Sequence, residues 1–210
     1  MSVAEPIAPG HLAGEHFVQF FDAEDSRAQS VAAYLARGYF ARQPLLVVAQ
    51  GRHWIEISQQ LQARGVPVQP AVAAGRLVVR DAAETLRRIT RNGSPDAAAF
   101  EAVVGGALAA LHRDQPVCVY GEMVDMLAQV GDLSDAIKLE RLWNGLATRV
   151  PFSLMCGYSA AHFVQASTHR ALLEICASHC GVHRHSADAL ASWLLDSVQP
   201  AAVGPGPLEI

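Results

Sequence analysis

Five short apolar segments recur along the chain, and longer stretches with helical spacing separate them. The run from Pro44 to Ala49 is continuously apolar, which is typical of a strand covered on both faces in a parallel sheet. Strands that alternate with helices imply right-handed crossovers and helices on both faces of a mainly parallel sheet. The sequence therefore predicts an α/β fold with strands at His16–Phe21, Pro44–Ala49, Gly75–Arg80, Pro116–Tyr120 and Pro151–Gly157.

The segments between these strands predict helices that end at glycine, proline or polar residues. We expect them over residues 23–40, 52–64, 96–112 and 133–149, after Asp81, from Glu122 onward, and in a C-terminal helical extension over 167–180 and 187–195. Both ends of the chain are rich in proline, glycine and alanine without a period. We therefore expect a disordered segment over residues 1–14, a single domain over 15–198 and a disordered tail over 199–210.

Polar residues follow the predicted strands at their carboxyl ends. Asp22, Gln50 with His53, Asp81, Glu122 and Tyr158 come after the first to the fifth strand in turn. In an open α/β sheet, ligands bind in the crevice outside the carboxyl ends of the strands. Glu122 is the most prominent candidate, since a carboxylate stands where an apolar strand turns directly into a helix.

Composition limits the classes of function. The 210 residues carry a formal charge of −4, and the arginines are scattered, which argues against direct nucleic-acid binding. The sequence contains no apolar stretch long enough to span a membrane and no signal peptide at its start, so we expect a cytoplasmic protein without a membrane partner. Cys118 and Cys156 lie in apolar runs and are interpreted as small core residues.

Each polar candidate also has a purely structural interpretation. An acidic residue such as Glu122 in the first turn of a helix is stabilised by the macrodipole, by roughly 0.3 to 1 kcal/mol. Asp81 with Glu84 fits a helix capping box, which accounts for it fully. His53 is either a ligand donor or a solvated residue at a helix start. The turn from Ala49 to Trp54 lacks the Gly-Lys-Ser/Thr of a phosphate loop, so ATP is not an expected cofactor.

Cysteines and histidines are densest near the C-terminus. Cys176, His179, Cys180 and His183 are three or four residues apart, so a continuous helix would place them on one face. Such ligands suit zinc or another thiophilic transition metal. The alternative is a small buried Cys176 beside exposed histidines at a helix end, because Gly181 is a natural helix terminator.

The chain resembles the MEDS family, a sensory domain described in methanogens, methylotrophs and a dichloromethane-responsive repressor. The Tyr-Gly-Glu-Met stretch at residues 120–123 is the most specific of the matching pieces. The pieces follow the family order, and they are His16–Phe21, Leu45–His53, Arg80–Ala82, Val119–Val124, Leu139–Asn144, Phe152–Tyr158, and Cys176 with His179.

The resemblance implies a RecA-like or KaiC-like core that has lost its phosphate loop and senses small molecules or relays signals. Family members are commonly joined to DNA-binding or histidine-kinase modules, and their proposed ligand is a small hydrocarbon-like compound. This sequence has no helix-turn-helix and no kinase region, so we expect it to act in trans. Cys180, His183 and His185 go beyond the family pattern.

The leading hypothesis is a non-enzymatic sensory domain that binds a small ligand and regulates a signalling partner, such as a histidine kinase or a transcription regulator. The expected ligand contacts are Glu122, His53, His16 and Tyr158, supported by Asp81 and Asn144. A homo-oligomer is compatible with this hypothesis. The alternatives are a degenerate nucleotide-binding enzyme with Glu122 as general base, a metal or redox sensor built on the C-terminal cysteines and histidines, and an inert scaffold.

Overall fold

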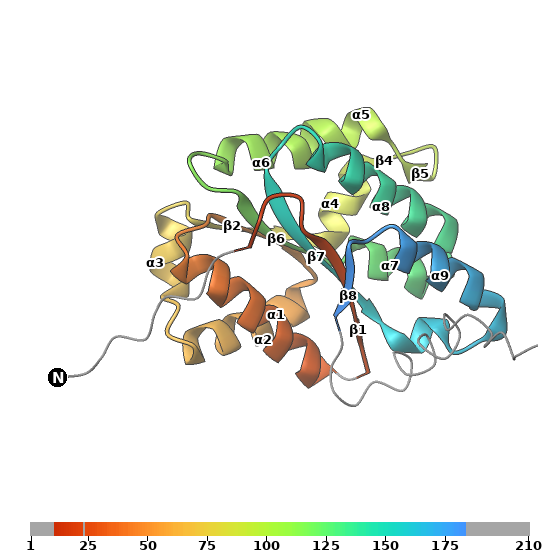
Figure 1. Ribbon diagram of the computed structural model, residues 1–210, viewed down its shortest axis with the longest axis horizontal. Coiled ribbons are helices and arrows are strands. Elements are labelled where there is room, and N and C mark those ends of the chain that lie inside the picture. Colours follow the sequence, from red (N-terminus) through yellow and green to blue (C-terminus); the bar gives the residue numbers. More distant parts are fainter. Residues whose placement is uncertain (1–10, 23, 184–210) are drawn as a thin grey trace, which may run out of the picture.

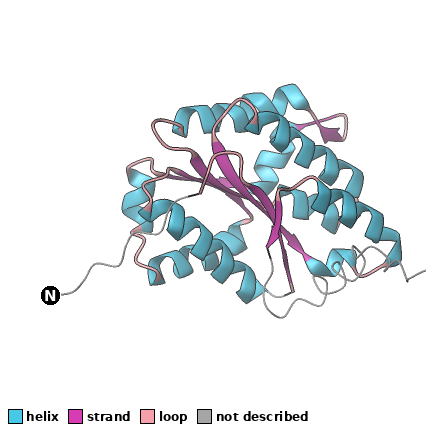
Figure 2. Ribbon diagram, viewed as in Figure 1, coloured by secondary structure: helices cyan, strands magenta, loops and turns pink. Residues whose placement is uncertain are grey.

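A six-stranded sheet runs through the middle of the computed structural model, which describes residues 11–22 and 24–183 (Figures 1 and 2). The strand order is β3-β2-β6-β7-β1-β8, and every pair of neighbours is parallel. The predicted α/β class with a parallel sheet is therefore confirmed. The strands are β1 (His16–Phe21), β2 (Leu45–Ala49), β3 (Leu77–Asp81), β6 (Val117–Gly121), β7 (Phe152–Ser159) and β8 (Gly181–His183).

Helices cover both faces of this sheet. The face that we call face A packs against α1 (Glu24–Phe40), α2 (Gly51–Ala63) and α3 (Val68–Ala73). The opposite face, face B, packs against α4 (Ala82–Ile89), α5 (Ala97–Phe100), the π-helix η1 (Glu101–Gly105), α6 (Gly106–Leu111), α7 (Met123–Gln129), α8 (Leu133–Ala147), the 3-10 helix η2 (Ala160–Phe163) and α9 (His169–Ala177). A short 3-10 turn, η3 (Ala166–Thr168), precedes α9.

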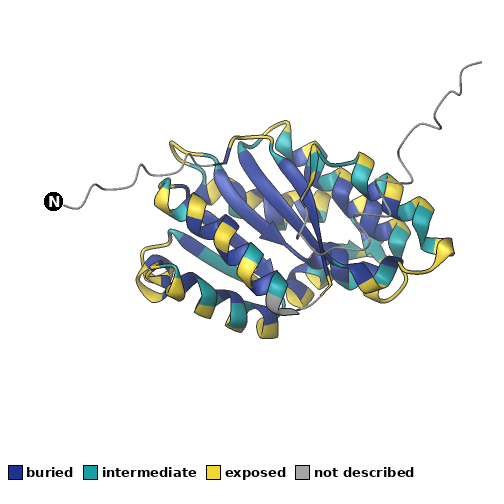
Figure 3. Cartoon of the chain, turned by 60° about the horizontal axis from the view of Figure 1, so that its bottom comes forward, coloured by how far each residue is buried: buried dark blue, intermediate teal, exposed yellow. Residues whose placement is uncertain are grey.

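The strands β1, β2, β6 and β7 are buried because helices cover them on both sides (Figure 3). Successive side chains of a strand point to opposite faces. In β1, Phe17 and Phe21 accordingly pack on face A, whereas Val18 and Phe20 pack on face B. All five residues of β2 are buried. Each large apolar side chain buried in this way contributes roughly 1.5 to 3 kcal/mol.

Several local predictions differ from the structure. The helix predicted over 96–112 is interrupted by the π-helical turn η1. Ahead of it, Asn92 and Gly93 adopt positive φ angles of 52° and 83° and join the two short strands β4 (Thr90–Arg91) and β5 (Ser94–Pro95). Consecutive positive φ angles are what a tight hairpin turn requires.

The C-terminal helix is shorter than predicted. It ends at Ala177, and the chain then forms the sixth strand, β8, which pairs with β1. A glycine at residue 181 opens that strand. The helix predicted over 187–195 lies outside the described residues. In the described part of the chain, no helix combines the length and apolar character that a membrane crossing requires.

Candidate functional site

Glu122 lies between the carboxyl ends of β2 and β6, which are neighbours in the sheet. The helix after β2 packs on face A, and the helix after β6 packs on face B. Neighbouring strands whose helices leave in opposite directions form a topological switch point, where α/β proteins bind ligands. Glu122 precedes α7 and is fully buried.

Several donors converge on the Glu122 carboxylate. His53 Nδ1 lies 2.8 Å from Oε2, and the Tyr120 hydroxyl donates to the same oxygen over 3.2 Å. The backbone N–H of Gln50 donates to Oε1, and Arg27 Nη1 lies 3.7 Å from Oε2. The prediction that His53 and Glu122 meet at the edge of the sheet therefore agrees with the geometry.

Arg27 connects Glu122 to a second buried carboxylate, Asp125, over 3.2 Å. Asp125 Oδ1 also accepts the Ser159 N–H over 2.7 Å and lies 3.0 Å from His162 Nε2. Burial by itself raises the pKa of Asp125, but His162, Arg27 and the Ser159 N–H outweigh it and lower that pKa.

We call Arg27, His53, Tyr120, Glu122 and Asp125 the Glu122 network. Burial and the Glu122 carboxylate raise the pKa of Tyr120 well above its usual range, so the hydroxyl stays a donor. Burial opposes the charge of Arg27, but Tyr120 and the two carboxylates raise its pKa further. The network joins α1, α2, β6 and α7 at one edge of the sheet.

The low pKa of Asp125 gives a pH-dependent stability. The group contributes stability above the unfolded carboxyl pKa of about 3.9, and this contribution is lost as the pH falls through the folded pKa. Asp125→Asn should therefore lower the free energy of unfolding by roughly 1.5 to 3 kcal/mol at pH 5, the usual worth of hydrogen bonds to a charged group. Urea unfolding of both proteins at pH 5 and pH 3 checks this, and a difference that stays constant would contradict it.

The other expected pocket residues lie on the opposite face of the sheet. Tyr158 packs in the core of face B, whereas Tyr120 packs in that of face A. His16 and Asn144 are also on face B, where His16 Nδ1 lies 2.8 Å from Asn144 Oδ1. The predicted pocket is thus divided, with Glu122 and His53 in one polar group and His16, Tyr158 and Asn144 in another.

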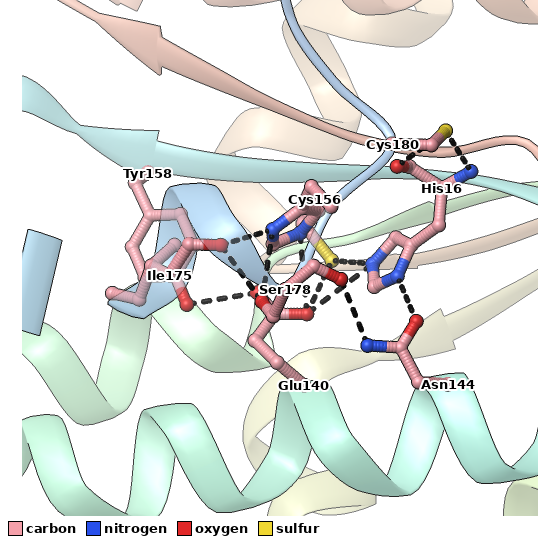
Figure 4. A network of polar contacts seen from close by, with 9 residues as sticks. His16, Glu140, Asn144, Cys156, Tyr158, Ile175, Ser178 and Cys180 are labelled. Atoms are coloured by element: carbon pink, nitrogen blue, oxygen red, sulfur yellow. Dashed lines mark hydrogen bonds and ion pairs between the residues drawn. The ribbon is translucent and has the colours of Figure 1, made fainter. Parts of the chain in front are cut away.

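Glu140 of α8 is the centre of this second group (Figure 4). The Tyr158 hydroxyl donates to its Oε1 over 2.8 Å. Its Oε2 lies 3.3 Å from His16 Nε2, 3.2 Å from Cys156 Sγ and 3.4 Å from His179 Nε2. We call His16, Glu140, Cys156 and His179 the Glu140 cluster.

The charges of Glu140 and the neighbouring histidines are complementary. Burial raises the pKa of a carboxyl group, but His179 and His16 outweigh it and bring the pKa of Glu140 below its usual range. Burial likewise lowers the pKa of His179, yet Glu140 and the Ile175 carbonyl raise it overall. Burial and the Glu140 charge raise the pKa of Cys156 well above that of a free thiol.

The C-terminal cysteines and histidines do not share one helical face, because α9 ends at Ala177 and residue 183 belongs to β8. Cys176 packs against the core of face B. Cys180 Sγ contacts the backbone N–H and carbonyl of His16, over 3.1 Å and 2.9 Å. Only His179 of the predicted metal set lies in the Glu140 cluster.

Asp81 is not part of either polar group, although its strand neighbour Ala49 precedes Gln50. It is the N-cap of α4, and its Oδ1 accepts the Glu84 N–H over 2.8 Å, as the capping motif predicts. The Glu84 carboxylate does not complete the capping box, because it accepts from Arg87 instead.

Sequence reasoning missed Arg27, Asp125 and Glu140. For two of these residues, Arg27 and Glu140, the helical spacing of the sequence did contain a signal. Arg27 stands four residues before Val31 in α1, and Glu140 stands three residues before Trp143 in α8. Both charges thus occupy the buried face of an amphipathic helix, and buried charges require partners.

One known family covers most of the chain. Residues 15–179 match the family described as MEDS, the methanogen/methylotroph, DcmR sensory domain. The match extends from the residue before β1 to the turn after α9 and includes both polar groups. No curated protein matches the chain. Because the matched residues make up well over half of the sequence, the chain belongs to the MEDS family of sensory domains.

Proposed function

We propose that this protein senses a small molecule at the carboxyl edge of the sheet, with Glu122 and His53 as the ligand contacts. The observation that carries the proposal is the concentration of buried charge at the switch point between β2 and β6. Replacing buried ion pairs by apolar groups is often neutral or stabilising. The presence of Arg27, Glu122 and Asp125 together there is better explained by binding than by stability.

The same contacts suggest how a signal would leave the site. A ligand with a hydroxyl or amino group competes with His53 or Arg27 for the Glu122 carboxylate. His53 belongs to α2 and Arg27 to α1, so displacement of either shifts a helix on face A. A ligand that binds the shifted arrangement more tightly increases its population.

Access to the site requires a movement at its rim. Glu122 is fully buried, whereas the His162 side chain in η2 is 19% exposed. Because His162 contacts Asp125, opening of η2 exposes the Glu122 network. The partner proposed for the resulting change is a cytoplasmic signalling protein, such as a histidine kinase or a transcription regulator, contacted in trans or through a homo-oligomer.

An enzyme with Glu122 as general base is less well supported. A general base must lie within reach of the proton that it removes from a substrate. Glu122 already accepts from Tyr120 and Gln50 and pairs with His53. In the sensor proposal, the domain descends from a RecA-like or KaiC-like core that has lost its phosphate loop. Such a domain would keep ligand binding and lose catalysis.

A cavity of about 280 Å³ offers a second location for a ligand. It lies between β2, α4 and the π-helix η1, and its lining includes Leu46, Val103 and Ala107 together with Arg80 and Arg88. Ligand pockets are mostly apolar with a few placed polar groups, and π-helical turns frequently occur at functional sites.

Thermal shift measurements distinguish the two locations. The probes are dichloromethane, methanol, methylamine and acetate, and each variant is compared with and without probe, so that its own stability cancels. At least one probe should raise the melting temperature of the wild type. We expect Glu122→Gln to abolish that rise and Ala107→Phe, which fills the cavity, to leave it unchanged. The reverse result would place the ligand in the cavity, and no rise in any protein would count against the proposal.

A further inference from the structure

We propose that His16, Glu140, Cys156 and His179 together bind one transition-metal ion of the zinc class. The inference is independent of the ligand site at Glu122, because these four residues form a separate group. Figure 4 shows His16, Glu140 and Cys156 of this group beside α8. The metal set expected from the sequence shares only His179 with this site.

Four of the six spacings between the potential ligand atoms match tetrahedral coordination. One nitrogen, oxygen or sulfur atom from each residue lies within 4.8 Å of all the others. With bonds of about 2.0 to 2.3 Å, a tetrahedral Zn²⁺ holds its ligand atoms roughly 3.3 to 3.7 Å apart. Oε2 of Glu140 lies 3.3, 3.2 and 3.4 Å from its three neighbours, and His16 Nε2 lies 3.3 Å from Cys156 Sγ.

Both histidines are oriented as metal ligands. Nδ1 of His179 lies 2.6 Å from the Ile175 carbonyl, and Nδ1 of His16 lies 2.8 Å from Asn144 Oδ1. Asn144 is itself oriented, because its Nδ2 donates to the Ser178 carbonyl over 2.8 Å. Carbonyl oxygens only accept, so Nδ1 carries the proton in each ring. When a ring is neutral its lone pair is then on Nε2, which in both histidines faces Oε2 of Glu140, an arrangement typical of metal-bound histidines.

Glu140 presents one oxygen to the same centre. Its Oε1 accepts from Tyr158, which leaves Oε2 directed at the other three residues. A carboxylate, two imidazoles and a thiolate form a donor set suited to Zn²⁺. Binding of the ion displaces the proton of the Cys156 thiol and any proton on His179 Nε2, and these protons pass to solvent.

A metal ion would also satisfy a buried atom. The side chain of His179 is fully buried, and its Nε2 has no hydrogen-bond partner among the described residues, although Oε2 of Glu140 lies 3.4 Å away. A buried polar atom without a hydrogen bond is costly. Coordination to an ion at the centre of the cluster would remove this cost.

Four protein ligands leave no open position, which is the arrangement of structural rather than catalytic zinc sites. The ligands come from β1, α8, β7 and the turn between α9 and β8. The ion would thus fix the C-terminal turn against the sheet.

Cobalt substitution tests the site. The full chain is produced without a histidine tag, its metal content is measured, and it is then stripped with a chelator and titrated with Co²⁺. We expect about one zinc per chain as isolated, and the visible bands of tetrahedral Co²⁺ with a thiolate-to-cobalt charge-transfer band on titration. Metal-free protein that gives no such bands would overturn the proposal.

Cysteine variants identify the ligand set. Cys156→Ser should abolish the charge-transfer band, whereas the matched controls Cys176→Ser and Cys180→Ser should retain it. A band that survives in Cys156→Ser and disappears in either control would overturn the assignment. Asn144→Ala leaves all four ligands in place and should weaken Co²⁺ binding by roughly 10 to 100-fold, measured by chelator competition. Asn144→Ala also tests the site if Cys156→Ser fails to fold. An unchanged Co²⁺ affinity in Asn144→Ala would then count against the site.

Discussion

Glu122→Ala is expected to lower the free energy of unfolding by about 3 to 5 kcal/mol, the usual cost of removing one partner from a buried ion pair. The substitution leaves Arg27 buried beside a single remaining carboxylate, Asp125. It also removes the acceptor of the Tyr120 hydroxyl and of the Gln50 N–H. Equilibrium urea unfolding at neutral pH, followed by circular dichroism, measures the change.

Glu122→Gln is the matched control, because it keeps the size of the side chain and one carbonyl acceptor. We expect a smaller loss than for alanine, since the Gln50 N–H retains a partner. If Glu122→Ala lowers the free energy of unfolding by less than about 1 kcal/mol, the range of an exposed ion pair, the Glu122 network does not stabilise the fold as expected.

Trp143→Ala is expected to cost about 3 to 5 kcal/mol, the typical result of truncating a buried aromatic ring. Trp143 is 1% exposed and packs edge-on against Phe100 at 5.1 Å and Phe152 at 5.8 Å, measured between ring centroids. It therefore joins α8 to the sheet and to α5. Chemical denaturation gives the free energy, and the slope of the transition shows whether unfolding remains two-state.

Two controls separate packing from other effects. Trp143→Phe keeps an aromatic ring and removes an indole N–H that has no hydrogen-bond partner in the described structure, so it should cost less than alanine. Val130→Ala truncates a side chain that is 78% exposed and should change stability by no more than about 0.5 kcal/mol. Equal losses for Trp143→Phe and Trp143→Ala would contradict the packing explanation.

The layered fold could be predicted because its strands are continuous apolar runs. A run such as Leu45–Ala49 is typical of a strand buried on both faces, and its alternation with helical segments indicates a parallel sheet with two helical layers. The meeting of His53 and Glu122 followed from the same reasoning, since both come directly after a strand. The three-residue strand β8 was too short to give any periodic signal.

The division of the pocket could not be predicted from a single sequence. The face that a side chain points to depends on whether its position in the strand is odd or even. Its neighbours then depend on which helices cover that face. Tyr158 and Tyr120 both lie near the ends of neighbouring strands, yet they point to opposite layers. Cys156 fitted an apolar run and was interpreted only as core. Its contact with Glu140 depends on the packing of α8, which local sequence does not encode.

The position of β1 has a consequence for synthesis of the protein. β1, the first of the described strands, lies between β7 and β8, the last two of them, and His16 pairs with Leu154, which is 154 − 16 = 138 residues later. At about 5 to 20 residues per second on the ribosome, β1 waits roughly 7 to 30 s for its partners. During that time its phenylalanines lack the neighbouring strands that help to bury them, and we expect chaperone binding to the nascent N-terminal part to prevent aggregation.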